Sequence, residues 1–290
     1  MSHVSPAYAY QYRSATGTDE EYVNRLIGEL EAEFWRIGPG NVVAFVAEPV
    51  VGATSGCVAS PKGYFPAVRR LCDKYGILLI LDEVMCGMGR TGRMFAFEED
   101  DVVPDMVTIG KGLGGGYAQI AAVLVGKRIV DVLRQGTCAF NHGHTYQAHP
   151  VSCASALAVQ RIVCRDKLVD RCAGMGKLLE SLLRRALEGS KYVGDIRGRG
   201  LFWAVEFLKD RKTKKSFDRT MGFGLRVQQA AFERGVAVYS GSGTVDGIEG
   251  DNVWLAPPFT VTEKNLREIV DVLREAYDSQ EKYVDRLDYK

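Results

Sequence analysis

Residues 77–116 decide the fold of this chain, and they read ILLILDEVMCGMGRTGRMFAFEEDDVVPDMVTIGKGLGGG. The stretch opens on the apolar run Ile77–Leu81 and closes on a second run, Met106–Ile109, which a glycine-rich tract follows. Apolar runs this short predict buried strands rather than helices. Asp82 follows the first run and Lys111 follows the second, so each predicted strand ends beside a charged residue.

Helices and strands are expected to alternate before this stretch. Thr18 and Glu21 form a capping-box pair at the start of an amphipathic helix over Glu20–Ile37, and the apolar run Val42–Ala47 predicts a strand. A second helix is expected to begin at Ser60, which serves as its N-cap before a proline. This alternation implies a mainly parallel sheet that helices cover on both faces.

The second half of the chain predicts a different arrangement. A further strand is expected at residues 121–125, followed by helices at 128–134, 151–165 and 168–187. Beyond these, we expect strands within 192–207, 236–239 and 252–255 and helices at 222–234 and 262–277. The pattern predicts a partial large domain over residues 1–167 and a smaller α+β C-terminal domain over residues 168–290.

The composition is that of an ordinary globular protein. The chain has 290 residues, 46% of them hydrophobic, and 37 Lys+Arg against 36 Asp+Glu give a formal net charge of +1. Neither nucleic acid nor a membrane surface is expected as a partner, because both need many phosphates neutralised together. No apolar stretch reaches the roughly 18 residues that span a bilayer, and we expect a soluble protein without a signal peptide.

No metal site or disulfide framework is predicted. The seven cysteines include no C-x-x-C pair and no histidine at zinc-ligand spacing. Cys72, Cys153 and Cys164 fall in apolar stretches, where we expect the thiol to act as a small hydrophobic group. His142 and His144 lack a carboxylate or thiolate to complete a ligand set, and polar contacts to an anion suit them better.

The residues just after the predicted strands are the first candidates for chemistry, because ligands of open α/β sheets bind beyond the carboxyl ends of the strands. For Asp82 two interpretations stay open, a carboxylate that faces a ligand and an N-cap of the next segment. Lys111 is either a solvated lysine or an amine that desolvation makes nucleophilic by lowering its pKa. The glycines that follow Lys111 match neither a phosphate loop nor the dinucleotide fingerprint.

An acid after one strand, a lysine after the next and a hydroxyl-bearing loop form the set of parts that pyridoxal 5'-phosphate requires. The cofactor needs an amine to join it covalently, a carboxylate to keep its ring nitrogen protonated, and donors for its phosphate. The segments LLILDEVMCGMGRTGRMFAFE, PDMVTIGKGLGGGY, HGHTYQAHP, GDIRGRGLFWAVEF and LAPPFTVT follow in that order. Together they resemble the class III (subgroup II) aminotransferases of fold type I over nearly the whole chain.

The resemblance implies a fold and a role for each site residue. The fold is α/β, a fold type I pyridoxal phosphate-dependent transferase with a mainly parallel sheet flanked by helices and a smaller α+β C-terminal domain. Lys111 matches the lysine that holds the cofactor and moves the proton, Asp82 the carboxylate at the ring nitrogen, and Val84 a residue that packs on the ring. Thr145 matches a threonine that reaches the phosphate in the neighbouring subunit, which implies a homodimer. Glu48 matches a glutamate near the substrate.

Three departures from the family pattern affect these expectations. Family members have a much longer chain before the lysine, so we expect an N-terminally truncated sequence that lacks the phosphate-binding helix terminus. Met85 stands where many relatives have a glutamine that bonds to the cofactor, and a thioether is a weak acceptor. Trp254 stands where relatives acting on α-amino acids have an arginine for the carboxylate, which favours an ω-amino or primary amine donor.

The predicted function is transfer of an amino group from an amine or amino acid to a keto acid or aldehyde. Racemisation and decarboxylation remain alternatives, because the protein around the cofactor selects the bond that breaks. The other hypothesis is a truncated, non-catalytic homologue that acts only as a dimerising or inert subunit. The expected location is cytoplasmic, with a mitochondrial location left open.

Overall fold

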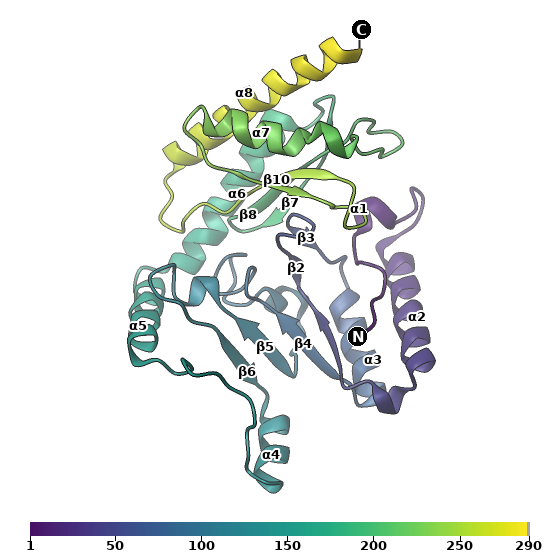
Figure 1. Cartoon of the computed structure of the whole chain (residues 1–290), viewed down its shortest axis with the longest axis vertical. Helices are drawn as coiled ribbons and strands as arrows, with labels where there is room; N and C mark the ends of the chain where they lie inside the picture. The colour runs from purple at the N-terminus through teal and green to yellow at the C-terminus, as the bar shows by residue number, and fades with distance from the viewer. Residues whose placement is uncertain (289–290) are drawn as a thin grey trace. The chain divides into compact units, whose positions relative to one another are not determined.

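The computed structural model describes residues 1–288, which form two compact units (Figure 1). The first unit comprises Met1–Pro49, Ser60–Gly89 and Arg93–Leu168. The second unit comprises Val50–Ala59, Arg90–Gly92 and the chain from Val169 onwards. Two short segments from the first half of the chain therefore belong to the second unit, which a division by position along the chain does not foresee.

Hydrogen bonds explain why these two segments belong to the second unit. The guanidinium of Arg197 donates to the carbonyls of Ser55 and Gly56, at 2.7 and 2.8 Å. The guanidinium of Arg90 donates to the carbonyl of Leu201 at 3.1 Å. Each segment is thus held by backbone carbonyls that bond to a buried or half-buried arginine.

The first unit contains a four-stranded sheet in the order β1-β4-β5-β6. Strands β1, β4 and β5 run parallel, so the mainly parallel sheet predicted from the sequence is confirmed. Strand β6 pairs with β5 in the antiparallel direction. The elements of the unit are α1 (Ala9–Tyr12), α2 (Asp19–Ile37), η1 (Pro39–Asn41), β1 (Ala44–Ala47), α3 (Tyr64–Tyr75), β4 (Leu78–Asp82), η2 (Ala96–Asp100), β5 (Met106–Ile109), η3 (Lys111–Leu113), β6 (Ala122–Val125), α4 (Lys127–Gln135) and α5 (Pro150–Arg165).

One face of this sheet carries the core of the first unit. Helices α2 and α3 pack on it, and Phe65, Val68, Leu79 and Leu81 are among the buried side chains of the cluster. The start of α2 is fixed by the capping box predicted from the sequence. The hydroxyl of Thr18 accepts a hydrogen bond from the backbone N–H of Glu21, and the carboxylate of Glu21 accepts one from the backbone N–H of Thr18.

The opposite face of the sheet is partly exposed at its two edge strands. Val46 on β1 and Val123 on β6 keep 61% and 50% of their surface accessible. The two central strands are better covered on this face, because Ile80 and Met106, which pair in register beside Val46, are half-buried.

The start of α3 also differs from the prediction. The helix begins at Tyr64 rather than after Ser60, and no side chain caps it. Gly63 precedes it with a φ of +88°, which turns the chain away from helical geometry just before the first helical residue. The Ser60-Pro61 pair therefore lies outside the helix.

The second unit contains a four-stranded antiparallel sheet in the order β7-β8-β10-β9 and a two-stranded hairpin, β2-β3. Side chains of α6, α7 and α8 form its core with one face of the four-stranded sheet. Its elements are β2 (Val50–Val51), β3 (Val58–Ala59), α6 (Leu168–Leu187), β7 (Val193–Arg199), β8 (Phe202–Phe207), η4 (Arg219–Met221), α7 (Phe223–Phe232), β9 (Tyr239–Ser242), β10 (Asp251–Leu255) and α8 (Glu263–Asp288).

The apolar run before β9 does not form the predicted strand. The backbone N–H of Val236 donates to the carbonyl of Ala231 at 3.0 Å, so this residue closes the end of α7 and the strand starts only at Tyr239. Helix α8 in turn extends past the predicted end at Tyr277. No helix among the described residues has the length and apolar character to cross a membrane.

The cysteines behave in two ways. Cys72 is buried, as expected of a small hydrophobic group, but Cys153 and Cys164 are exposed. The expectation for these two residues is wrong because much of α5 is exposed. Its apolar residues Val151 and Leu157 are 68% and 52% accessible.

Candidate functional site

The first unit brings two of the predicted site residues to one edge of its sheet. Asp82 is the last residue of β4, and Lys111 follows the end of β5 after a single glycine. The strands are parallel neighbours, and Asp82 pairs in register with Thr108. The carboxyl ends of both strands therefore meet at the same edge, where open α/β sheets bind their ligands.

Local bonds orient the carboxylate of Asp82. Its Oδ1 accepts a hydrogen bond from the backbone N–H of Val84 at 2.9 Å. This is the local turn role that the sequence left open, and it occupies only one of the two carboxylate oxygens. The side chain is half-buried, so the second oxygen can act toward a ligand.

Lys111 lies on a strained and well-supported turn. Its side chain is exposed and its φ is +38°. Residues with a side chain adopt this backbone conformation at a cost of about 1–3 kcal/mol. Nε2 of Gln160 on α5 donates to the carbonyls of Gly112 and Leu113 at 3.1 and 2.9 Å. These bonds hold the turn that carries the lysine and offset part of the strain.

Val84 lies directly beside this turn. A Cβ atom built on Gly110 would stand 3.4 Å from Cγ1 of Val84. A Cβ on Gly112 would stand 3.0 Å from the Cβ of Met88 in the same loop. The absence of side chains at both glycines lets the loop after β4 pack against the backbone on either side of Lys111.

Glu83 is a buried acid to which the sequence assigned no role of its own. Its side chain is fully buried and accepts hydrogen bonds from the backbone N–H groups of Ala96 and Phe97, at 2.7 and 2.9 Å. Burial raises the pKa of its carboxyl from 4.5 to about 7, although these two bonds and the nearby charges also act on it. Glu83 ties both ends of the loop that contains Val84. The Asp-Glu pair at the end of an apolar run was the signal that could have revealed it.

The other two predicted residues lie in different surroundings. Glu48 follows β1 and is half-buried; since Ala47 pairs with Leu81, it stands at the same sheet edge, beside the end of β4. Thr145 lies in the loop between α4 and α5, where residues 132–151 are all exposed. The first unit therefore gathers Glu48, Asp82 and Lys111 at one edge and places Thr145 on an exposed loop.

Among the described residues, no group of histidine, cysteine, aspartate and glutamate side chains could hold a metal ion. The arrangement instead joins an accessible amine, a half-buried carboxylate and a loop braced by a buried acid. Such a set can hold a carbonyl compound at the amine and a basic ring nitrogen at the carboxylate.

Comparison with known proteins agrees on one family. The family model for class-III aminotransferases matches residues 2–277. An uncharacterized aminotransferase of Schizosaccharomyces pombe is 49% identical over 278 residues, which cover 96% of this chain and 61% of that protein. The diaminobutyrate–2-oxoglutarate transaminase of Halomonas elongata is 36% identical, over 92% of this chain and 56% of that protein.

Solved structures give the same result. The (S)-enantioselective omega-transaminase of Thermomicrobium roseum matches with a TM-score of 0.86 and 38% identity, over 97% of this chain and 60% of that one. The fold type I architecture is therefore shown. The chain spans 54% to 61% of the length of the relatives it matches.

Proposed function

Because the chain belongs to the class-III aminotransferase family, we propose that it takes part in pyridoxal phosphate-dependent amino-group transfer. The observation that carries the proposal is the placement of Lys111 and Asp82 at the carboxyl ends of two neighbouring parallel strands. The lysine amine is accessible, and Asp82 keeps one carboxylate oxygen outside its local bond to Val84. These residues fit a cofactor that has both an aldehyde and a ring nitrogen.

The roles follow from the chemistry of each side chain. The amine of Lys111 would hold the cofactor and, once displaced by a donor amine, carry the proton. The carboxylate of Asp82 would keep the ring nitrogen protonated, and Val84 would pack on a ring face. Glu48 would lie toward the substrate. When bound, pyridoxal phosphate supplies an electron sink for the bonds at the donor carbon.

The donor is proposed to be an ω-amino compound or a primary amine. Trp254, where several α-amino acid enzymes have an arginine, pairs with Tyr239 across β10 and β9, and the two rings lie 4.6 Å apart. An indole cannot form the paired hydrogen bonds that a guanidinium makes with a carboxylate. Relatives named gamma aminobutyrate transaminase in Solanum lycopersicum and omega-transaminase in Thermomicrobium roseum support this substrate class. The acceptor is proposed to be a keto acid or aldehyde.

A homodimer is also proposed. The exposed loop that carries Thr145 includes Phe140 and Tyr146, which are 64% and 75% accessible. Large apolar side chains gathered on one exposed segment favour a protein partner. A second copy would cover them and bring Thr145 to the cofactor phosphate of its neighbour.

For location we propose the cytoplasm, because the seven cysteines are free, as is usual in reducing compartments. Relatives in Solanum lycopersicum are named as mitochondrial and chloroplastic.

The test is reconstitution of the purified chain with pyridoxal phosphate. We expect a visible absorbance band of the bound cofactor, which Lys111→Ala abolishes and Lys62→Ala, a change at another exposed lysine, leaves intact. Because Lys111 is also the residue that moves the proton, Lys111→Ala lowers the rate of amino-group transfer by about 10²–10⁴-fold. Asp82→Asn keeps the acceptor for the N–H of Val84 but removes the charge, so the band should remain while the rate falls. Identical spectra for wild type and Lys111→Ala contradict the proposal.

A further inference from the structure

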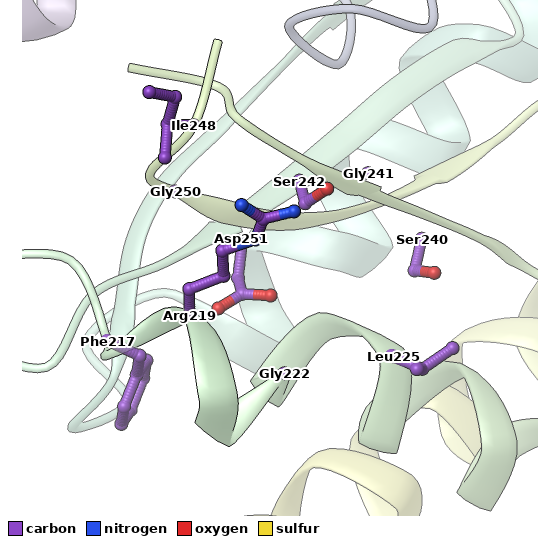
Figure 2. A pocket seen from close by; sticks show the side chains of 10 residues that line it. All are labelled: Phe217, Arg219, Gly222, Leu225, Ser240, Gly241, Ser242, Ile248, Gly250 and Asp251. Atoms are coloured by element: carbon purple, nitrogen blue, oxygen red, sulfur yellow. The ribbon is translucent and has the colours of Figure 1, made fainter. Parts of the chain in front are cut away.

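The second unit contains a cavity that the proposed function does not use. Its volume is about 230 Å³, and it lies between the first turn of α7, the strand β9 and the turn that leads into β10 (Figure 2). Drug-sized ligands occupy pockets of about 300–1,000 Å³. This cavity therefore suits a smaller molecule.

Two opposite charges line this cavity without pairing with each other. Asp251 is 7% exposed, and its Oδ1 accepts from the backbone N–H of Gly224 at 3.2 Å, at the amino end of α7. Arg219 extends from the preceding turn toward the strands, as Figure 2 shows. In the described part of the chain, Arg219 forms no ion pair or hydrogen bond. An exposed guanidinium and a buried carboxylate that also bonds to the backbone of Phe223 and Gly224 thus line one small space.

The remaining lining is apolar or offers neutral polar groups. Leu225 and Ile248 form apolar walls, and they are 61% and 60% exposed. Gly241 and Gly250 contribute backbone to the lining, and the exposed Ser242 adds a hydroxyl. Because both apolar side chains are exposed, covering them with an apolar group of a ligand is favourable.

We propose that this cavity binds a free α-amino acid with an apolar side chain. The carboxylate of the amino acid pairs with Arg219, its ammonium group pairs with Asp251, and its side chain lies between Leu225 and Ile248. A ligand with only negative charge fits less well, because the buried carboxylate of Asp251 repels it. Burial raises the pKa of the Asp251 carboxyl, and an ammonium beside it restores the charged form. The proposal does not depend on cofactor binding in the first unit.

The test is isothermal titration of the cofactor-free chain with L-leucine, N-acetyl-L-leucine and L-leucinamide. The second probe lacks the ammonium group and the third lacks the carboxylate. We expect L-leucine to bind at least tenfold more tightly than either. Arg219→Gln and Asp251→Asn should each weaken L-leucine by at least tenfold; asparagine keeps an acceptor for the N–H of Gly224, and a far-UV spectrum checks that both variants fold.

Two matched controls change charge nearby without lining the cavity. Lys212→Gln removes an exposed cation from the segment before Arg219, and Glu249→Gln removes an exposed anion from the turn before Asp251. Both should bind L-leucine as the wild type does. Absence of binding overturns the proposal, as does equal binding of N-acetyl-L-leucine or inorganic phosphate, which indicates an anion site. Binding that survives both Arg219→Gln and Asp251→Asn places L-leucine elsewhere and also overturns it.

Discussion

Replacing Glu83 by glutamine removes a buried acid whose titration opposes folding at neutral pH. The pKa of this carboxyl rises from 4.5 to about 7 in the folded chain because burial outweighs its two backbone N–H bonds. Between these values the folded chain holds a proton that the unfolded chain has released. The contribution of Glu83 to the free energy of unfolding is therefore fully present below about pH 4.5 and lost as the pH rises to about 7. At about 1.4 kcal/mol per pH unit, the loss amounts to about 3 kcal/mol.

Glutamine keeps the shape of the side chain but cannot titrate. Its amide oxygen can accept from only one of the N–H groups of Ala96 and Phe97, so the variant loses about 1–3 kcal/mol at low pH. At neutral pH the wild type carries the penalty of a buried charge and the variant does not. The stability advantage of the wild type over Glu83→Gln should thus shrink by about 3 kcal/mol between about pH 4.5 and about pH 7.5.

Urea unfolding followed by far-UV circular dichroism measures this difference at each pH. Glu99→Gln is the matched control, because Glu99 lies on η2, the short helix whose Ala96 and Phe97 bond to Glu83. Its side chain is 54% exposed and pairs with Arg93 at 3.4 Å. Its stability should follow the wild type across the whole pH range. Parallel pH profiles for wild type and Glu83→Gln refute the reasoning, because they mean that Glu83 has the same pKa in the folded and unfolded chain.

Three further changes test the supports of the fold. Thr18→Ala removes the hydroxyl of the capping box and should lower stability by about 1 kcal/mol in thermal unfolding; an unchanged midpoint contradicts the role of the cap. Gln160→Leu removes both bonds to the turn of the lysine and should cost about 1–3 kcal/mol in urea, with weaker binding of added cofactor. Arg197→Ala removes the partner of the fully buried Glu206 and should cost about 3–5 kcal/mol, whereas Arg184→Ala, in an exposed pair, should cost less than about 1 kcal/mol. Equal losses in the last two variants would argue against a burial-dependent cost.

Much of the secondary structure could be predicted from local patterns. The capping box at Thr18, the strands that end at Asp82 and Ile109, and the helix over Leu168–Leu187 all follow from signals within a few residues. Such signals come from residues that are close neighbours along the sequence. Where a turn residue intervened, as Gly63 did before α3, the same reasoning misplaced the boundary.

The amino-acid sequence by itself determined that an acid and a lysine stand after two buried strands, because apolar runs and their flanking residues are readable one segment at a time. Only the tertiary structure decided what surrounds them. Gln160 bonds to the turn of Lys111 from 48 residues away, Glu83 is buried by the loop it holds, and Val46 at the edge of the sheet is left exposed. These features arise where distant segments pack together, and burial, strain and shifted pKa values belong to that packing rather than to any one stretch of chain.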